Sequence, residues 1–158
     1  MTLPFLYSVE REFAVPVERL WSAWTDAAEL EAWYFPVGLG SLKGGTISDL
    51  RVDGVWASAV EVAAHNFTAY FYGKYTNIVD QELIEHTMHY TESKVEFELK
   101  YMFGPAHNVV INFEVRENGS WVKFSQFGEL PAGEEKRAQA GMESYLDSLE
   151  GHLGLRQI

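Results

Sequence analysis

The alternation of apolar and polar residues predicts a strand near the start of the chain. Phe5, Tyr7, Val9 and Phe13 all stand at odd-numbered positions within residues 5–14. Alternate residues of a strand point to the same face of a sheet, and neighbouring residues point to opposite faces. We therefore expect residues 5–14 to form a strand with one buried face.

Apolar residues at helical spacing follow this strand. Val17, Leu20, Trp21 and Trp24 lie three, four and seven positions apart, which predicts a short helix. Pro16 precedes them, and proline suits the first turn of a helix because its missing N–H group is not needed there.

A second short helix is predicted to begin at Asp26, whose side chain can cap the first free N–H groups. Glu29 stands three residues later and can reach back to complete a capping box. This helix would carry Leu30 and Trp33. It would end before Pro36, because the residue that precedes a proline disfavours the α conformation.

Strand patterns dominate the middle of the chain. Residues 36–48 hold four glycines and little periodicity, which predicts a loop. From about residue 49 to residue 128, runs of apolar and polar residues alternate with short turn signals, and short connections favour antiparallel pairing. The expected strands cover residues 55–63, 67–78, 83–90, 94–103, 108–115 and 121–127.

The segment 94–103 has the clearest alternation in this series. The charged residues Glu96, Glu98 and Lys100 at even positions would face solvent. Its odd positions would form the apolar face, with Val95, Phe97, Leu99, Tyr101 and Phe103.

The C-terminal segment 131–155 is predicted to be one long helix. Its apolar stripe recurs at intervals of three and four residues. The stripe consists of Ala138, Met142, Tyr145, Leu149 and Leu153. The order of the elements predicts an α+β fold in which an antiparallel sheet packs its apolar face against this final helix.

Length and composition narrow the class of protein. We expect a single domain over residues 1–158. Twelve Lys and Arg residues against 23 Asp and Glu residues give a net charge of −11, which disfavours nucleic acid and anionic membranes as partners. The absence of cysteine excludes disulfides, thiolate catalysis and zinc–thiolate sites. Without a signal-peptide pattern or a long apolar run, we expect a cytoplasmic protein.

Four segments resemble one known family. Residues 11–26 are similar to its opening strand, proline-led helix and Trp-x-Ala-x-Thr-Asp string, and residues 49–54 resemble its Asp-Leu-Arg-Val-Gly-Gly string. Residues 73–87 and 141–149 resemble a later strand pair and the final helix. Over about residues 7–154 the chain resembles the SRPBCC, or Bet v 1/START-like, superfamily, and within it the group related to the C-terminal domain of the activator of Hsp90 ATPase.

The chain departs from the family pattern at several positions. Met142 stands where the family usually has tryptophan, which alters the surface that the final helix presents to the sheet. Asp53 replaces a glycine, Ala27 replaces a common proline, and Asp80 with Gln81 replaces a pair of prolines. None of these changes alters the expected fold.

The resemblance implies a helix-grip fold, in which a curved antiparallel sheet wraps around the long C-terminal helix and two short helices follow the first strand. It also implies an internal cavity between the sheet and the helix. Members of the superfamily bind apolar ligands, cyclise polyketides or assist a chaperone, so the fold alone does not select a function.

Strand parity and the helix stripe together predict the lining of such a cavity. Buried tyrosines and tryptophans need partners for their polar tips, so several together favour a binding space over a solid core, the other interpretation of this set. Trp33 and Phe35 would stand at its mouth. The remaining ligand-binding candidates are Trp56, Val60, Phe71, Tyr75, His86, Met88, Phe97, Tyr101, Phe124, Gln126, Met142 and Tyr145.

The histidines do not predict a metal site. His86 and His89 are three residues apart in an expected strand, so their imidazoles point to opposite faces. His86 would be either a structural residue or a group that orients a ligand. No Gly-x-Ser-x-Gly motif is present, no catalytic residue is assigned, and no cofactor is implied.

Three functions remain. The first, which we favour, is a small-molecule-binding domain for an apolar or aromatic ligand. The second is a polyketide cyclase-like or dehydratase-like enzyme that would use His86 with a tyrosine such as Tyr101 for acid–base chemistry. The third is an Hsp90-activator-like interaction module, which we expect least because the additional N-terminal domain of that family has no room here. The sequence leaves a homodimer open.

Overall fold

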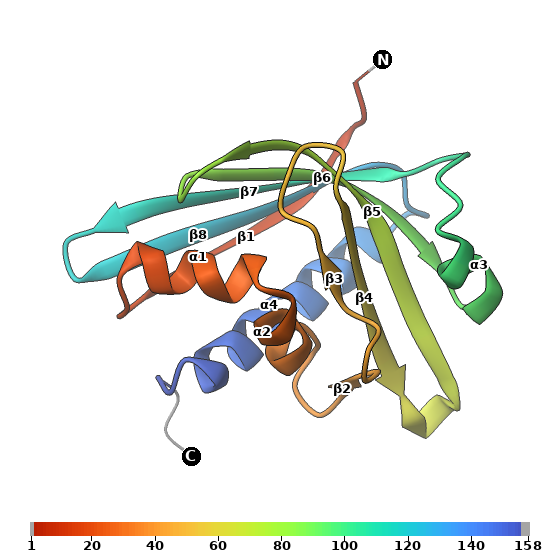
Figure 1. Ribbon diagram of the computed structural model, residues 1–158, viewed down its shortest axis with the longest axis horizontal. Coiled ribbons are helices and arrows are strands. Elements are labelled where there is room, and N and C mark those ends of the chain that lie inside the picture. Colours follow the sequence, from red (N-terminus) through yellow and green to blue (C-terminus); the bar gives the residue numbers. More distant parts are fainter. Residues whose placement is uncertain (1, 156–158) are drawn as a thin grey trace.

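An antiparallel sheet curls around one side of a long helix in the computed structural model, which describes residues 2–155 (Figure 1). The predicted α+β helix-grip architecture is confirmed. In chain order the elements are β1 (Phe5–Phe13), α1 (Val17–Thr25), α2 (Ala27–Trp33), β2 (Gly40–Ser41), β3 (Ile47–Ser48), β4 (Val55–Val62), the 3-10 turn η1 (Ala63–His65), β5 (Phe67–Val79), β6 (Leu83–Thr91), α3 (Lys94–Leu99), β7 (His107–Arg116), β8 (Gly119–Phe127) and α4 (Glu134–His152).

The sheet is a meander that closes back onto the first strand. Within residues 2–155 its eight strands follow the order β1-β8-β7-β6-β5-β4-β2, and β3 also pairs with β4. Strands β4 to β8 are sequential antiparallel neighbours, as the short connections predict. Helices α1 and α2 carry the chain from β1 across to the opposite edge, and α4 lies along the concave face (Figure 1).

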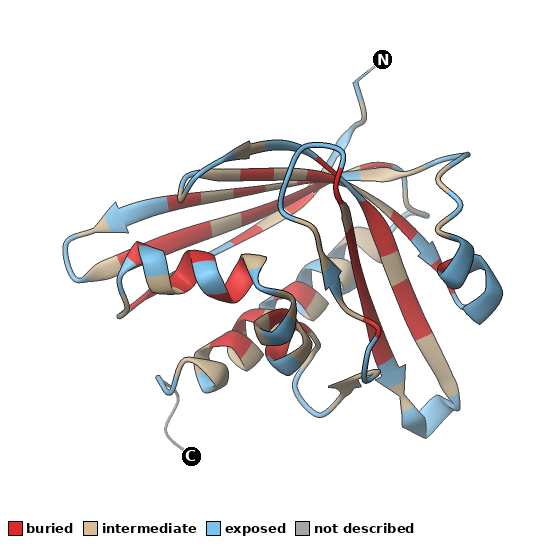
Figure 2. Ribbon diagram, viewed as in Figure 1, coloured by how far each residue is buried: buried red, intermediate tan, exposed pale blue. Residues whose placement is uncertain are grey.

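The main core lies between the concave face of the sheet, α1 and α4. Buried residues alternate along β7, whereas β8 is buried on both faces over much of its length; Figure 2 shows the burial along the sheet. Burial of a large apolar side chain stabilises a fold by roughly 1.5–3 kcal/mol, so this face is the main source of stability. Its fully buried members include Leu20 of α1, Ile84, Val109 and Val122 of the sheet, and Leu146 and Leu149 of α4.

The cap of α2 forms as predicted in one half only. The Asp26 side chain accepts a hydrogen bond from the backbone N–H of Glu29 at 3.3 Å. The Glu29 carboxylate does not return to Asp26. It lies 2.6 Å from Arg19 of α1 and 2.9 Å from Nε2 of His152 at the end of α4, so it links three helices instead.

The segment 94–103 is not the predicted strand. Residues 94–99 form α3, and residues 100–106 follow without regular structure. Ser93 caps the helix by accepting from the N–H of Glu96, Lys94 pairs with Glu98 at helical spacing, and Lys100 ends it in the left-handed region at φ 51°. A good cap and strong helix formers therefore outweigh the two-residue alternation.

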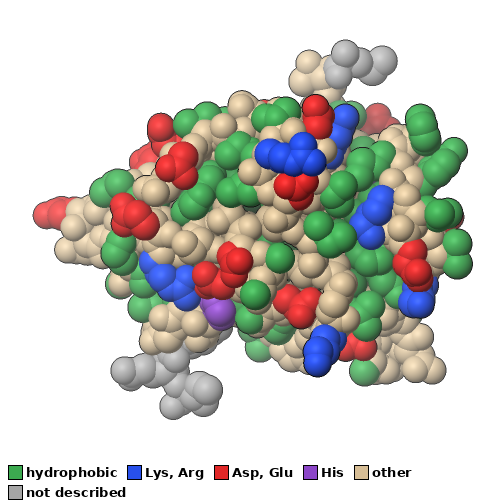
Figure 3. Space-filling model, in the orientation of Figure 1, with side chains coloured by type: hydrophobic (Ala, Val, Ile, Leu, Met, Phe, Trp, Pro, Cys, Tyr) green, Lys and Arg blue, Asp and Glu red, His purple; other side chains and the backbone are tan. Residues whose placement is uncertain are grey.

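The change from strand to helix moves several aromatic side chains. Phe97 packs on the convex face against Tyr70 and Tyr72, in a cluster separate from the main core. Tyr101 and Phe103 remain 59% and 77% exposed. Figure 3 shows hydrophobic side chains gathered at the end of the molecule where α3 and the following loop lie.

Two further features differ from or add to the sequence predictions. The predicted loop 36–48 contains the short strands β2 and β3, which pair with β4. On the concave face, Arg11 of β1 lies 2.8 Å from Asp147 and 2.9 Å from Glu150, both on α4.

In residues 2–155 no helix combines the length and the apolar character that a membrane span requires.

Candidate functional site

A cavity of about 230 Å³ lies between the sheet and α4. An engineered apolar cavity of about 150 Å³ binds benzene, so this space suits a molecule of about two fused rings. Its lining comes from β1, the end of α2, β4, β5, β6, β8 and α4. The lining residues are Tyr7, Tyr34, Trp56, Phe71, Met88, Phe124, Gln126, Ala138, Gly141, Met142 and Tyr145.

The lining carries no Lys, Arg, Asp or Glu among the residues that the structure describes. Burial of an ionised group without a partner is costly, so the arrangement suits a neutral occupant. Two flexible methionines, Met88 and Met142, face the space together with rigid aromatic rings. Methionine side chains adapt to different shapes, whereas aromatic rings offer large flat contact areas.

Two tyrosines from different elements meet at one side of the cavity. Tyr34, directly after α2, packs edge to face against Tyr145 of α4, with ring centroids 4.8 Å apart. Neither hydroxyl has a hydrogen-bond partner within residues 2–155. Neither is among the buried polar atoms that are closed off without a partner, so both keep accessible surface, which the cavity provides.

These phenols are neutral groups. Burial raises the pKa of Tyr145, and it raises that of Tyr34 together with the nearby phenols of Tyr145, Tyr7 and Tyr75. A raised pKa keeps a phenol protonated at neutral pH. Each of the two unpartnered hydroxyls can therefore donate or accept a hydrogen bond to a molecule in the cavity.

A third tyrosine is already engaged. The hydroxyl of Tyr7 on β1 donates to Oε1 of Gln126 on β8 at 2.6 Å. The Nε2 atom of Gln126 lies 2.7 Å from Nδ1 of His107. The amide of Gln126, one of the predicted ligand-binding groups, therefore bonds to protein partners at both ends.

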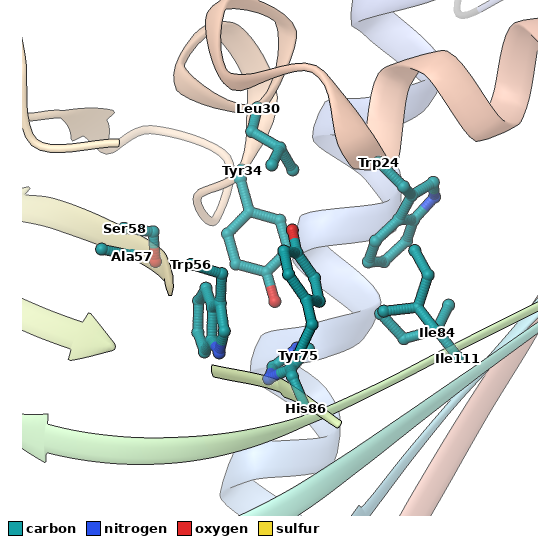
Figure 4. A pocket seen from close by; sticks show the side chains of 10 residues that line it. All are labelled: Trp24, Leu30, Tyr34, Trp56, Ala57, Ser58, Tyr75, Ile84, His86 and Ile111. Atoms are coloured by element: carbon teal, nitrogen blue, oxygen red, sulfur yellow. The ribbon is translucent and has the colours of Figure 1, made fainter. Parts of the chain in front are cut away.

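A smaller space of about 20 Å³ adjoins the cavity and shares Tyr34 and Trp56 with it. Figure 4 shows its lining side chains, with Tyr34 reaching into the same space as Trp56 and Tyr75. His86 lies here, with its Nδ1 2.8 Å from the carbonyl of Thr87 and its ring centroid 4.1 Å from that of Trp56.

Burial lowers the pKa of His86 to about 4, and the hydrogen bond to Thr87 offsets only part of that effect. The imidazole is therefore neutral at physiological pH and a weak base. His89 points to the convex face, where its ring stacks on Tyr72 at 5.2 Å. The two histidines lie on opposite faces of β6, as the sequence predicts, and no metal-binding cluster occurs within residues 2–155.

The structure brings together part of the predicted lining. Trp56, Phe71, Met88, Phe124, Gln126, Met142 and Tyr145 line the larger cavity, and Tyr75 and His86 line the smaller space. Their role in ligand binding stays a prediction.

Five candidates lie elsewhere. Phe97 and Tyr101 do not face the cavity, because α3 replaces the predicted strand. Trp33 is 1% exposed and donates its Nε1–H to the carbonyl of Ala23, so it supports Tyr34 from within the core. Val60 is buried in β4, and Phe35 is half-buried beside α4; neither lines the two spaces.

The sequence analysis missed four residues that line the larger cavity. Tyr7 stands at a predicted inward position of β1, and Ala138 belongs to the predicted stripe of α4, so both were within reach of the pattern. Gly141 lies in the segment that resembles the family's final helix. Tyr34 had no signal, because it follows the end of α2 and its ring direction depends on packing against Trp24, Trp33 and Tyr145.

Comparisons with known proteins agree on one family. The family model described as Activator of Hsp90 ATPase homolog 1-like protein matches residues 14–154. A comparison of the sequence with curated proteins found no match.

Solved structures show the same fold. An AHSA1 protein from Silicibacter pomeroyi is 22% identical, with a TM-score of 0.78 over 96% of this chain and 99% of that chain. A Chromobacterium violaceum protein is 21% identical, with a TM-score of 0.74 over 90% and 93%. An AHSA1-like protein from Aeromonas hydrophila is 18% identical, with a TM-score of 0.70 over 96% of both chains.

Proposed function

Since this chain belongs to the activator of Hsp90 ATPase homolog 1-like family of the SRPBCC superfamily, we propose that it binds a neutral, largely apolar small molecule between its sheet and α4. The observation that carries this proposal is the cavity of about 230 Å³. Its lining, as far as the described chain goes, consists of aromatic and aliphatic side chains with one amide and no charged residue. Apolar walls with a few polar groups are typical of small-molecule sites.

The hydroxyl groups in the lining also favour a bound molecule over an empty cavity. The hydroxyls of Tyr34 and Tyr145 have no partner within residues 2–155. Buried tyrosine hydroxyls usually find a hydrogen-bond partner. An empty apolar cavity also forfeits dispersion contacts with its walls, and a fitting molecule restores them.

The test begins with the purified protein. We expect native mass spectrometry to reveal a bound small molecule. We also expect 2-ethylnaphthalene, a neutral two-ring probe, to raise the melting temperature progressively as its concentration rises above its Kd. A wild-type protein that carries no ligand and gives no thermal shift with the probe would contradict the proposal.

A matched pair of glycine variants on α4 places the probe. A Cβ at Gly141 or at Gly151 meets no atom within 4 Å, but only Gly141 lines the cavity. Leucine has a higher helix propensity than glycine, so neither substitution should disrupt α4. We expect Gly141→Leu to weaken 2-ethylnaphthalene binding at least tenfold and Gly151→Leu to leave it unchanged. Equal binding by both variants would mean that the probe binds elsewhere.

The enzymatic alternative loses its proposed acid–base pair. His86 faces the concave side of β6, whereas Tyr101 lies in the exposed loop after α3, where its carbonyl accepts from Tyr72 of the convex face. The two side chains do not meet at one space, so the pairing that the sequence suggested is wrong.

A further inference from the structure

A row of hydrogen bonds connects the surface of the molecule with the cavity. At its outer end, Nε2 of His107, the first residue of β7, lies 3.2 Å from the backbone carbonyl of Glu129. Nδ1 of the same ring lies 2.7 Å from Nε2 of Gln126. At the inner end, Oε1 of Gln126 accepts from the hydroxyl of Tyr7 at 2.6 Å. Tyr7 and Gln126 line the cavity, and His107 does not.

The outer end determines the direction of every bond in this row. A backbone carbonyl can only accept, so the ring nitrogen that faces Glu129 carries the proton. In a neutral imidazole the other nitrogen is then an acceptor, and Gln126 must turn its NH₂ group toward it. The amide oxygen consequently faces Tyr7, whose hydroxyl has to donate.

The position of His107 is set by a glycine beneath its ring. A Cβ at Gly128 would overlap the imidazole of His107, so the ring can lie against the chain only because residue 128 has no side chain. The N–H of Gly128 donates to the carbonyl of Pro4 at 2.8 Å, which ties this segment to the chain just before β1. The ring is therefore held beside Gln126 by its surroundings.

Tyr7 consequently has one hydrogen-bonding role left. Its single proton is used on Gln126, so its oxygen can offer only lone pairs to the cavity. Tyr34 and Tyr145 differ, because their hydroxyls are unpartnered within residues 2–155 and can rotate to donate or to accept. Tyr7 is thus the lining hydroxyl that discriminates between donor and acceptor groups.

We infer that the molecule bound in this cavity carries a hydroxyl or N–H donor that bonds to Tyr7, and that His107 selects this donor from outside the cavity through Gln126. The inference rests on the proposed function and names the chemical class of the ligand, a neutral aromatic or aliphatic body with a donor group. His107 acts as a positioning residue, since it sets the direction of the row without touching the occupant.

Three naphthalene probes separate this inference from the proposed function. The probe 2-naphthol offers a donor, 2-methoxynaphthalene offers only an acceptor, and 2-ethylnaphthalene offers neither. We expect wild-type protein to bind 2-naphthol about fivefold more tightly than 2-methoxynaphthalene, the ratio that one neutral hydrogen bond contributes. Binding of all three probes with equal affinity would overturn the inference and leave the proposed function standing. Failure of all three to bind would overturn both.

Two tyrosine variants locate the acceptor. Tyr7→Phe removes it, so we expect equal binding of 2-naphthol and 2-methoxynaphthalene. Tyr145→Phe is the matched control, because it removes another lining hydroxyl that takes no part in the row. The ratio of the two affinities cancels any general change in cavity shape. A preference lost in Tyr145→Phe and kept in Tyr7→Phe would overturn the inference.

Two variants at His107 test the row itself. In His107→Asp, a carboxylate oxygen can accept from Gln126 in place of Nδ1, so we expect the preference for 2-naphthol to persist. His107→Leu leaves no acceptor at position 107, so the amide of Gln126 is free to reverse. We then expect 2-naphthol and 2-methoxynaphthalene to bind with nearly equal affinity. If His107 had only a structural role, the leucine variant would bind both probes more weakly by the same factor, and the aspartate variant would not restore binding.

A measurement without any ligand tests the direction of the row. Long-range ¹H–¹⁵N spectra distinguish the two tautomers of a neutral histidine. We expect His107 to carry its proton on Nε2. A proton on Nδ1 would reverse Gln126 and free the proton of Tyr7, and it would overturn the inference whatever the probes do.

Discussion

The rings of Trp56 and His86 lie with their centroids 4.1 Å apart, where β4 and β6 face the same buried space. Burial keeps the imidazole of His86 away from water and lowers its pKa to about 4. The ordinary value in an unfolded chain is about 6.5. The unfolded state therefore binds a proton at a pH where the folded state does not.

This difference predicts acid sensitivity. Between about pH 6.5 and pH 4 the unfolded chain binds more protons, so the free energy of unfolding should fall as the pH falls, by about 3 kcal/mol in total from His86. Below the folded pKa of about 4 this contribution levels off. Urea denaturation at a series of pH values measures the slope.

The His86→Phe variant isolates the contribution of this residue. His89 also has a pKa lowered by burial, and it remains in the variant. We expect the wild-type slope to exceed the variant slope by up to about 1.4 kcal/mol per pH unit in this range. Identical slopes would show that folding does not lower the pKa of His86.

Arg11 is expected to stabilise the attachment of α4 to β1. Its side chain is 20% exposed and contacts Asp147 and Glu150, whereas that of Arg51 is 70% exposed and pairs only with Asp49. We expect Arg11→Met to lower the free energy of unfolding by about 1–3 kcal/mol, because the charged hydrogen bonds from the Arg11 guanidinium to α4 are lost. Arg51→Met should change it by less than about 0.5 kcal/mol. Equal effects in urea denaturation would contradict this account.

Gly73 is expected to tolerate no side chain. A Cβ at this position of β5 would overlap the backbone carbonyl of Thr87 on β6. Gly73→Ala should therefore destabilise the protein by about 1–3 kcal/mol, because a backbone group must move. Gly40→Ala is the control, since a Cβ there meets no atom within 4 Å. Thermal unfolding of the two variants measures the difference, and a stable Gly73→Ala protein would show that β5 and β6 can separate slightly.

Met142 is expected to set the size of the cavity. It is buried in α4 and lines the space. Met142→Trp should fill part of the cavity and weaken 2-ethylnaphthalene binding at least tenfold, while thermal unfolding changes little because space is available. Phe97→Ala provides the contrast. It should cost about 3–5 kcal/mol of stability from the convex cluster and leave the affinity of the remaining folded protein unchanged.

Most of the fold could be predicted because its elements carry local signals. Pro16, the cap at Asp26 and the spacing of Trp21 and Trp24 marked the first helices, and the inward positions of β4, β5 and β6 followed strand parity. The largest exception was residues 94–103. Their alternation fits a strand, but the cap at Ser93 and the helix formers behind it favour α3.

The candidate site could be predicted only in part, for a related reason. Trp56, Phe71 and Met88 could be placed from parity alone, because a regular strand fixes which face each residue joins. Tyr34 could not, since it follows the end of a helix and its ring direction depends on Tyr145 more than 100 residues away. The same holds for the row from His107 to Tyr7, whose members lie on three strands.

The amino-acid sequence by itself determined the order of the elements, the inward face of the long strands and the apolar stripe of α4, because these depend on periods of two and of three to four residues within one segment. The tertiary structure decided what those faces enclose. It left a cavity whose lining carries no charge and holds two hydroxyls without a partner in the described part of the chain, and it made Gln126 a link between Tyr7 and His107. Hydrogen-bond direction depends on every partner in a row at once, and those partners meet only when the sheet curls around α4.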